Sequence, residues 1–169
     1  RKISPGGKSQ GSFRFLEFER RFMKDFSNSV MVALLPTTSE WCKIDLPHLT
    51  LVYVGEIPDL KDSAHNELAK TAVSLALISG PITLNVLGAD VFGDVDKVDV
   101  LKLEPSAALL ALRSVVEDWD DSTYPFNPHV TIGPVGSLVG ITVPTTITFD
   151  RIAVDWGDSL LQYKFLLNH

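Results

Sequence analysis

A nine-residue stretch occurs twice in the chain, and each copy carries a histidine two residues before a threonine. Residues 47–55 read PHLTLVYVG and residues 128–136 read PHVTIGPVG, so the second copy begins 81 residues after the first. In a β-strand, residues i and i+2 point to the same face. We therefore expect His48 and Thr50 to share one face of a strand, and His129 and Thr131 to share one face of another.

Two such pairs can do acid–base chemistry on a phosphodiester. One neutral imidazole takes a proton from the nucleophile, and one imidazolium gives a proton to the leaving oxygen. The two hydroxyls donate to the non-bridging phosphate oxygens, and no metal is required. Two alternatives remain open at this point: histidines that only cap strand ends through hydrogen bonds, and a duplicated fold that binds a ligand without turnover.

The doubled motif, with its apolar flanks, resembles the signature of the two-histidine (2H) phosphoesterase superfamily over residues 30–167. Within that superfamily it is similar to the 2′-5′ RNA ligase-like proteins and cyclic phosphodiesterases. The resemblance implies an enzyme that uses His48 and His129 as acid and base and Thr50 and Thr131 to bind phosphate, without a cofactor. Its substrate would be a 2′,3′-cyclic phosphate, a 2′-5′ linkage or a small cyclic (oligo)nucleotide.

The pattern of apolar residues predicts an α+β fold around these motifs. We expect two pseudo-twofold lobes, each an antiparallel sheet with an outer helix, and a central cleft between the sheets. The expected strands are 30–35, 49–54, 82–86, 89–92, 98–103, 141–143, 146–154 and 160–167, and the expected helices are 59–79 and 106–119. Residues 29–169 would form this 2H domain. Residues 1–28 read as a linker and a short helix, and we expect them to be part of a longer polypeptide.

Charge is unevenly distributed, which bears on the partners. The net charge of the whole chain is −6. Residues 1–24 carry a net charge of +5, so the remaining residues carry −11. An acidic body repels the backbone of a long nucleic acid. We therefore expect a small nucleotide or a short RNA end as substrate, with no long double-stranded nucleic acid and no membrane as partner. We also expect a monomer, tethered to a larger polypeptide.

Several aromatic residues near the motifs are candidates for stacking on a base. These substrate-binding candidates are Trp41, Tyr53, Tyr124 and Phe126, and Lys102 is a weaker candidate for phosphate. For Trp41 the alternative is a lid over the core, and for Tyr124 and Phe126 it is packing around the neighbouring prolines. No Cys/His cluster has metal-ligand spacing, and the lone Cys42 reads as an inert thiol.

Two readings of the function differ in class. The first is the metal-independent phosphodiesterase. The second is a nucleotide-binding or assembly module of a larger protein, viral sources included, without turnover. No apolar run is long enough for a membrane span and no secretory signal is visible, so we expect a cytoplasmic setting, that of the host if the source is viral. A viral enzyme that destroys a host cyclic-dinucleotide signal is a narrower form of the first reading.

Overall fold

The computed structural model describes residues 28–168. The expected linker and short helix within residues 1–27 therefore lie outside the described residues. The strands are β1 (Ser29–Pro36), β2 (Leu49–Glu56), β3 (Ile82–Phe92), β4 (Val98–Leu103), β5 (His129–Pro134), β6 (Thr146–Trp156) and β7 (Ser159–Lys164), and the helices are α2 (Ala64–Ile78) and α3 (Ala107–Val116).

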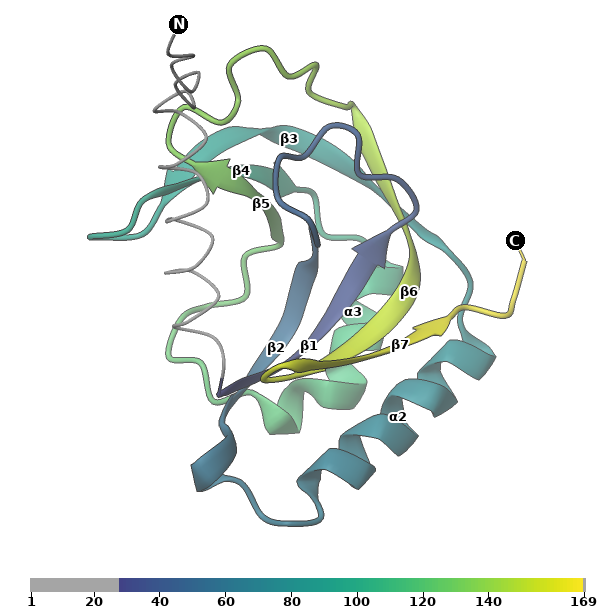
Figure 1. The fold of residues 1–169 in the computed structure, drawn as a ribbon. Coiled ribbons are helices and arrows are strands. Elements are labelled where there is room, and N and C mark those ends of the chain that lie inside the picture. Colours follow the sequence, from purple (N-terminus) through teal and green to yellow (C-terminus); the bar gives the residue numbers. More distant parts are fainter. Residues whose placement is uncertain (1–27, 169) are drawn as a thin grey trace, which may run out of the picture.

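All strand pairs are antiparallel, and the strand order is β2-β1-β6-β3-β4-β5, with β7 also paired to β6 (Figure 1). The long strand β3 belongs to two sheets. Its first part, from Ile82 to Asn85, pairs with β6, and the part from Val86 to Phe92 pairs with β4. The two expected antiparallel sheets are therefore present and are joined through one shared strand, which confirms the α+β fold.

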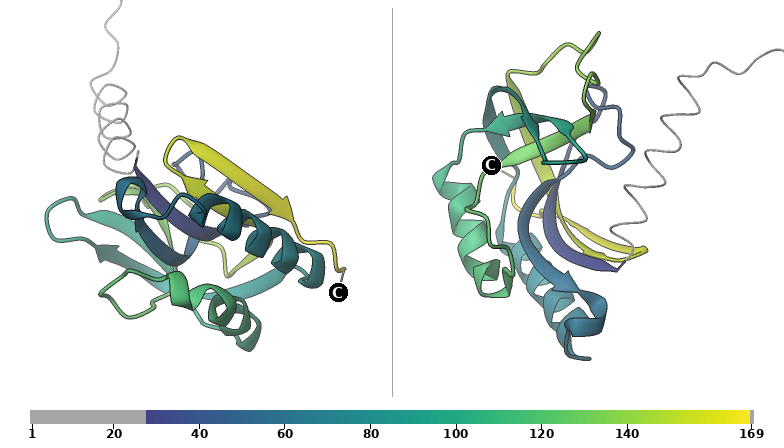
Figure 2. Two further views of the ribbon diagram at one scale, coloured as in Figure 1. Left: turned by 90° about the horizontal axis from the view of Figure 1, so that it is seen from below. Right: turned by 90° about the vertical axis from the view of Figure 1, so that its left-hand side faces the viewer.

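The two motif strands stand at opposite ends of this strand order, yet they contact each other. This is possible because the sheet is strongly curved, as both views in Figure 2 show. Twisted sheets curl in this way, and a shared strand with a bulge adds to the curvature. The curvature brings the edge strand β2 beside the edge strand β5, although the sequence separates their histidines by 81 residues.

The helices cover one side of the strands, as the right-hand view of Figure 2 shows, and the hydrophobic core lies between the helices and the strands. The apolar residues of both motifs point into it: Leu49, Leu51, Val130 and Ile132 are all at most 1% exposed. Helix α3 begins as the sequence predicts, because the Ser106 hydroxyl accepts a hydrogen bond from the Leu109 amide at 3.1 Å. The residues between the apolar ones, including both histidines, are left on the opposite face.

Two of the strand predictions were wrong. Residues 82–92 form one strand rather than two, because the chain bends at a bulge beside Gly88 (φ +149°) and continues to pair beyond it. Residues 141–143 form no strand, since they lie in an irregular segment that follows a turn and ends at Pro144, which has no amide hydrogen to donate. Within residues 28–168, neither helix is long and apolar enough to cross a membrane.

Candidate active site

His48 and His129 are held by the same local interaction. In each case the ring Nδ1 lies within hydrogen-bonding distance of the carbonyl oxygen two residues earlier: Leu46 at 3.0 Å for His48 and Asn127 at 2.7 Å for His129. A carbonyl oxygen only accepts, so Nδ1 carries the proton and donates it. The Nε2 atom of each neutral ring is then left with its lone pair available. The matched prolines Pro47 and Pro128, both buried, separate each histidine from its acceptor.

The two imidazoles lie close enough to influence each other's charge. Burial lowers the pKa of His129 below the ordinary histidine value; the Asn127 carbonyl opposes this effect, and the positive charge of His48 lowers the pKa further. Such an electrostatic effect requires the rings to be near one another. The effect of the His48 charge thus indicates that the two sequence-predicted histidines lie near each other, and the lowered pKa of His129 favours its neutral form.

Phe92 is one of the side chains that shelter His129. Its ring meets the imidazole of His129 edge to face, with 4.7 Å between ring centroids. Phe92 ends β3 and follows the bend in that strand, whereas His129 begins β5. The sequence predicts only that Phe92 ends a strand. Nothing in the sequence indicates which residue of β3 reaches the second motif.

Both threonines are half-buried beside their histidines. The hydroxyl of Thr50 points to the sulfur of Met31 at 3.7 Å, a weak contact that a phosphate oxygen can replace. Thr131 pairs across the strands with the fully buried Val100, and His129 pairs with Lys102. Directly paired residues project to the same face. Lys102 is therefore on the histidine side, where its ammonium lies 3.7 Å from Asp90.

Each motif strand is covered at its free edge by the loop that leads into the other motif. The sulfur of Cys42, in the loop before β2, lies 3.5 Å from the carbonyl oxygen of Thr131 in β5. In return, the amide of Asp121, in the loop before β5, donates to the carbonyl of Tyr53 in β2 at 2.7 Å. Burial raises the pKa of the Cys42 thiol, which agrees with an unreactive residue. The exchange of loops ties the two motifs into one unit.

Tyr53 lies on the same face as Thr50 although it is three residues away. A bulge in the pairing of β2 with β1 shifts the alternation, so that Thr50 and Tyr53 are half-buried while Leu51 and Val52 are fully buried. The Tyr53 hydroxyl donates to the Glu56 carboxylate at 2.6 Å. That hydrogen bond is the main cause of a raised pKa for Tyr53.

The other aromatic candidates occupy different surroundings. Trp41 is half-buried and packs against the hydrophobic core. Phe126 also packs against the core, with the Arg113 guanidinium 4.6 Å from its ring centre. Tyr124 is 78% exposed, on the loop before the second motif. None of these contacts places the three beside the histidines.

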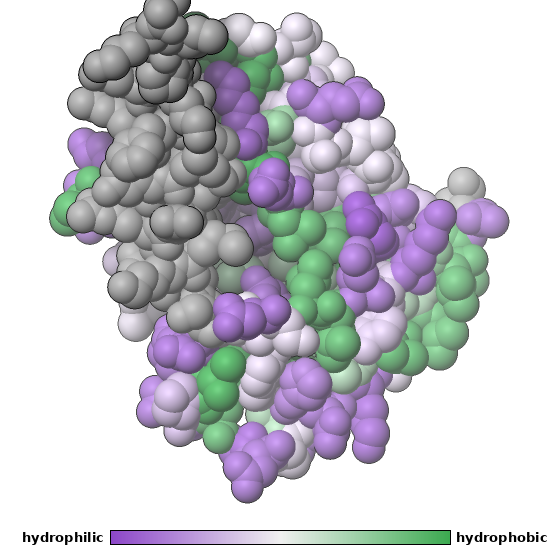
Figure 3. All heavy atoms as spheres, in the orientation of Figure 1, coloured by the Kyte–Doolittle hydropathy of each residue, from purple (hydrophilic) through white to green (hydrophobic). Residues whose placement is uncertain are grey.

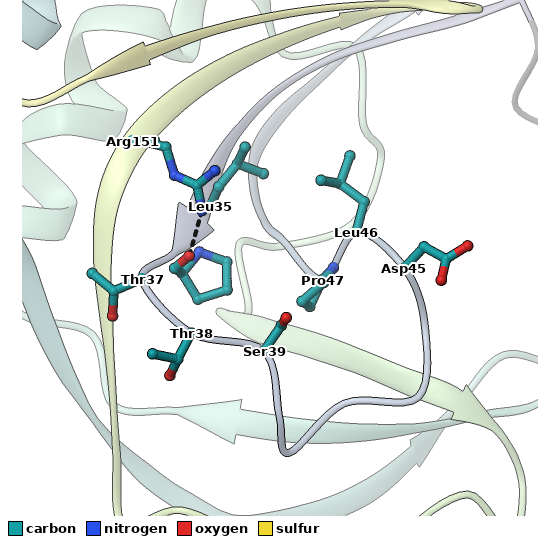
Figure 4. A pocket seen from close by; sticks show the side chains of 9 residues that line it. Leu35, Thr37, Thr38, Ser39, Asp45, Leu46, Pro47 and Arg151 are labelled. Atoms are coloured by element: carbon teal, nitrogen blue, oxygen red, sulfur yellow. Dashed lines mark hydrogen bonds between the residues drawn. The ribbon is translucent and has the colours of Figure 1, made fainter.

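A pocket of about 190 Å³ lies next to the first motif (Figure 4). It is enclosed by the loop between β1 and β2 and by Arg151 of β6, and Leu46, whose carbonyl holds His48, is in its wall. The Arg151 guanidinium bonds to the carbonyl of Pro36 at 2.6 Å. The pocket thus lies beside the residues that immediately precede His48, which is itself not among the lining residues.

In the surface view of Figure 3, hydrophobic residues gather near the middle of the face and hydrophilic residues border them.

Asp155 is a further residue on this face that the sequence did not reveal. Burial raises the pKa of its carboxyl group, and the positive charge of His48 partly opposes that rise. Only the pairing of β6 with β1 brings Asp155 near the first motif, more than a hundred residues away in sequence. Within residues 28–168 there is no cluster of three or more His, Cys, Asp or Glu side chains that could hold a metal ion.

Comparison with known proteins agrees with the motif and the fold. A family model described as the 2′-5′ RNA ligase superfamily matches residues 44–138, more than half of the chain, and that range includes both motifs. A protein of Bacillus pumilus, named provisionally as a phosphoesterase, is 35% identical over 89 residues, which are 51% of this chain and 50% of that protein. The chain thus spans about half the length of this curated relative.

Solved structures share the fold at low sequence identity. Usb1 of Kluyveromyces marxianus has a TM-score of 0.57 at 12% identity, covering 82% of this chain and 98% of that chain. TT0787 of Thermus thermophilus has a TM-score of 0.53 at 15% identity, covering 83% and 100%. A second structure of Usb1, with uridine monophosphate, has a TM-score of 0.50 at 12% identity, covering 93% and 94%. With the family match over both motifs, the chain belongs to the 2′-5′ RNA ligase superfamily of two-histidine phosphoesterases.

Proposed function

We propose that this chain is a metal-independent phosphodiesterase that opens a 2′,3′-cyclic phosphate, a 2′-5′ linkage or a small cyclic (oligo)nucleotide. The observation that carries the proposal is the pair of matched Nδ1-to-carbonyl hydrogen bonds of His48 and His129. These bonds leave the two Nε2 atoms as the groups that can exchange protons with a ligand, on the strand face that also carries Thr50 and Thr131.

The two histidines take different roles because their surroundings differ. His129 is sheltered by Phe92 and has a lowered pKa, so it is neutral near pH 7 and can accept a proton. In this mechanism, Nε2 of His129 removes a proton from water as the water oxygen bonds to phosphorus. The bond from phosphorus to the ribose oxygen breaks, and protonated His48 gives that oxygen a proton. Thr50 and Thr131 donate hydrogen bonds to the non-bridging oxygens.

The charge distribution supports a small substrate. Residues 28–168 are rich in carboxylates, and several of them, such as Asp90 and Asp155, lie on or near the histidine face. An extended polyanion would be repelled along its length, whereas a single phosphate needs only the imidazolium and the two hydroxyls. That Usb1 has been solved with uridine monophosphate supports a nucleotide as ligand for this fold.

The test is a turnover assay in the presence of EDTA. The panel is the four 2′,3′-cyclic mononucleotides, 2′-5′ diadenylate and cyclic dinucleotides, with products separated by chromatography. The His48→Ala/His129→Ala protein, with its fold checked by circular dichroism, is the matched control, because it lacks both imidazoles. Turnover of one class by the wild type alone identifies the substrate. Tight nucleotide binding without any turnover would contradict the proposed enzyme and support a nucleotide-binding module instead.

A further inference from the structure

Asp155 lies on the same face of the sheet as the catalytic histidines. Its neighbour Trp156 points the other way, since the Trp156 ring contacts His65 of α2 edge to face, with centroids 4.9 Å apart. Successive residues of a strand project to opposite faces, so Asp155 projects away from the helix. The effect of the His48 charge on Asp155 agrees with this placement.

Strand pairing puts Asp155 in a row with two other side chains. Met31 of β1 pairs with Asp155 on one side and with Tyr53 on the other. Paired residues share a face, so the row runs from an aromatic ring through a thioether to a carboxylate. The contact of the Thr50 hydroxyl with the Met31 sulfur, at 3.7 Å, shows that this row adjoins the phosphate-binding threonine.

The pairing of β1 with β2 sets the spacing between Thr50 and the row. Thr50 pairs with Ala33, and Ala33 is two residues from Met31 along β1. Two residues of a strand span about 6.6 Å. A phosphate held by Thr50 and Thr131 would therefore direct the base attached to the same ribose towards the row. There Met31 is buried (8% exposed), and the half-buried side chains of Tyr53 and Asp155 are the ones that a base can reach. Sulfur against an aromatic ring is a favourable contact.

A carboxylate in this position restricts which ligand groups can face it. An ionised carboxylate accepts hydrogen bonds and donates none, and its charge repels the substrate phosphate. The strand pairing of Asp155 involves only its backbone. Among the described residues, no side chain or backbone amide donates a hydrogen bond to its carboxylate. The groups that suit it are therefore N–H or O–H donors brought by the ligand.

We propose that Asp155 selects a guanine base in the substrate by accepting hydrogen bonds from its N1–H and 2-amino groups. This inference rests on the proposed function. In a 2′,3′-cyclic phosphate the 2′- and 3′-hydroxyls are esterified and only a single 5′-hydroxyl remains on the ribose, so two adjacent donors can come only from the base. Guanine presents two adjacent donors, which match the two carboxylate oxygens. Adenine and cytosine present one amino donor beside an acceptor, and uracil presents one N–H between two acceptors.

The test compares kcat/KM for 2′,3′-cyclic GMP, IMP and AMP. We expect the wild type to favour guanosine over inosine and adenosine by about tenfold or more, because the inosine substrate lacks only the 2-amino group. The Asp155→Asn variant should lose that preference and move towards adenosine, since an amide offers one donor and one acceptor. The matched control is Asp118→Asn, which removes an equal charge at an exposed residue that follows α3 and should keep the preference.

A binding measurement separates failure of this inference from failure of the proposed function. Calorimetry with the His48→Ala/His129→Ala protein should give guanosine 3′-phosphate a lower Kd than adenosine 3′-phosphate, whether or not the wild type turns anything over. Adding Asp155→Asn to that protein should remove the difference. Equal Kd values for the two nucleotides, or a guanine preference that survives Asp155→Asn, would overturn the role of Asp155. The wild-type comparison of guanosine with inosine decides the matter even if the Asp155 variant does not fold.

Discussion

His129 has a lowered pKa mainly because it is buried, and the positive charge of His48 lowers that pKa further, although the two residues are 81 positions apart in the sequence. The curvature of the sheet, the contact between β2 and β5 and the exchanged loops all serve to bring these rings together. The resulting site has two chemically similar groups in unequal environments. In the mechanism that we propose, this inequality lets one imidazole act as base while the other acts as acid.

Removing either histidine should stop most of the catalysis. We expect His48→Ala and His129→Ala each to lower kcat by about 10² to 10⁴, the usual contribution of a general acid or base. The double variant should lose far less than the product of the two effects, because both act in one proton transfer sequence. His65→Gln is the matched control, since His65 contacts Trp156 on the helix side. Full activity in the double variant would be incompatible with the mechanism.

Replacing Phe92 should change the pH dependence. In the Phe92→Ala variant water reaches His129, so the burial that lowers the His129 pKa is reduced and that pKa should rise. The acidic limb of kcat/KM, which reports protonation of the base, should then move to higher pH. Lys102 and Asp90, the other charged residues on this side of His129, are unchanged in the variant. An NMR titration of the His129 ring gives the same quantity directly; an unchanged or lower pKa would contradict the argument.

The lowered pKa of His129 also has a consequence for stability. Because the folded state holds the neutral form, the stabilisation is complete above the unfolded histidine value of about 6.5 and is lost as the pH falls through the lower folded value. His129→Gln removes the titrating group. Urea denaturation of both proteins between about pH 5 and pH 8 should therefore show a smaller fall in the free energy of unfolding for the variant at the acidic end. Parallel curves would mean that His129 is not sheltered.

Asp120 should matter for the position of the second motif. Its carboxylate accepts from the Arg113 guanidinium at 2.8 Å and from the amides of Tyr53 and Ser122 at 3.3 and 3.2 Å. The side chains of Asp120 and Arg113 are only 16% and 18% exposed. We expect Asp120→Ala to lower the free energy of unfolding by about 1 to 3 kcal/mol, measured by urea denaturation. Asp118→Ala, at an exposed neighbour, should change it by less than about 0.5 kcal/mol; equal effects would show that the network is unimportant.

The N-cap of α3 gives a test of the fold apart from the site. Ser106→Ala removes the acceptor for the Leu109 amide and should cost about 1 kcal/mol of stability. Ser114→Ala is a suitable comparison, since that exposed hydroxyl only donates back to the Ala111 carbonyl within the helix. Thermal unfolding should show a clear decrease in Tm for the first variant only. Equal Tm values for the two variants would show that the Ser106 N-cap does not stabilise the fold.

The sequence predicts the motif residues well because their spacing follows the strand period directly. His48, Thr50, His129 and Thr131 lie on one kind of face and their apolar neighbours on the other, as a period of two requires. The period fails beyond Thr50. A strict alternation puts Tyr53 on the opposite face, and only the bulge in β2 returns it to the side of Thr50.

Phe92 and Asp155 could not be predicted for a different reason. Each reaches the site through the pairing of strands that are distant in the sequence, and the residues of β3 and β6 carry no indication of their register. The bend at Gly88 decides where Phe92 arrives, and the alignment of β6 with β1 decides which aspartate faces the histidines. A bend of this kind also explains why one long strand was predicted as two.

The most direct measurement is kcat/KM across pH for the best substrate, with EDTA present, for the wild type and the two single histidine variants. Our account predicts a bell-shaped profile for the wild type, with an acidic limb that disappears in His129→Ala and a basic limb that disappears in His48→Ala. A profile that keeps both limbs in the single variants would contradict it. So would activity that EDTA abolishes and an added divalent metal restores, because the proton transfers would then depend on a group other than these two imidazoles.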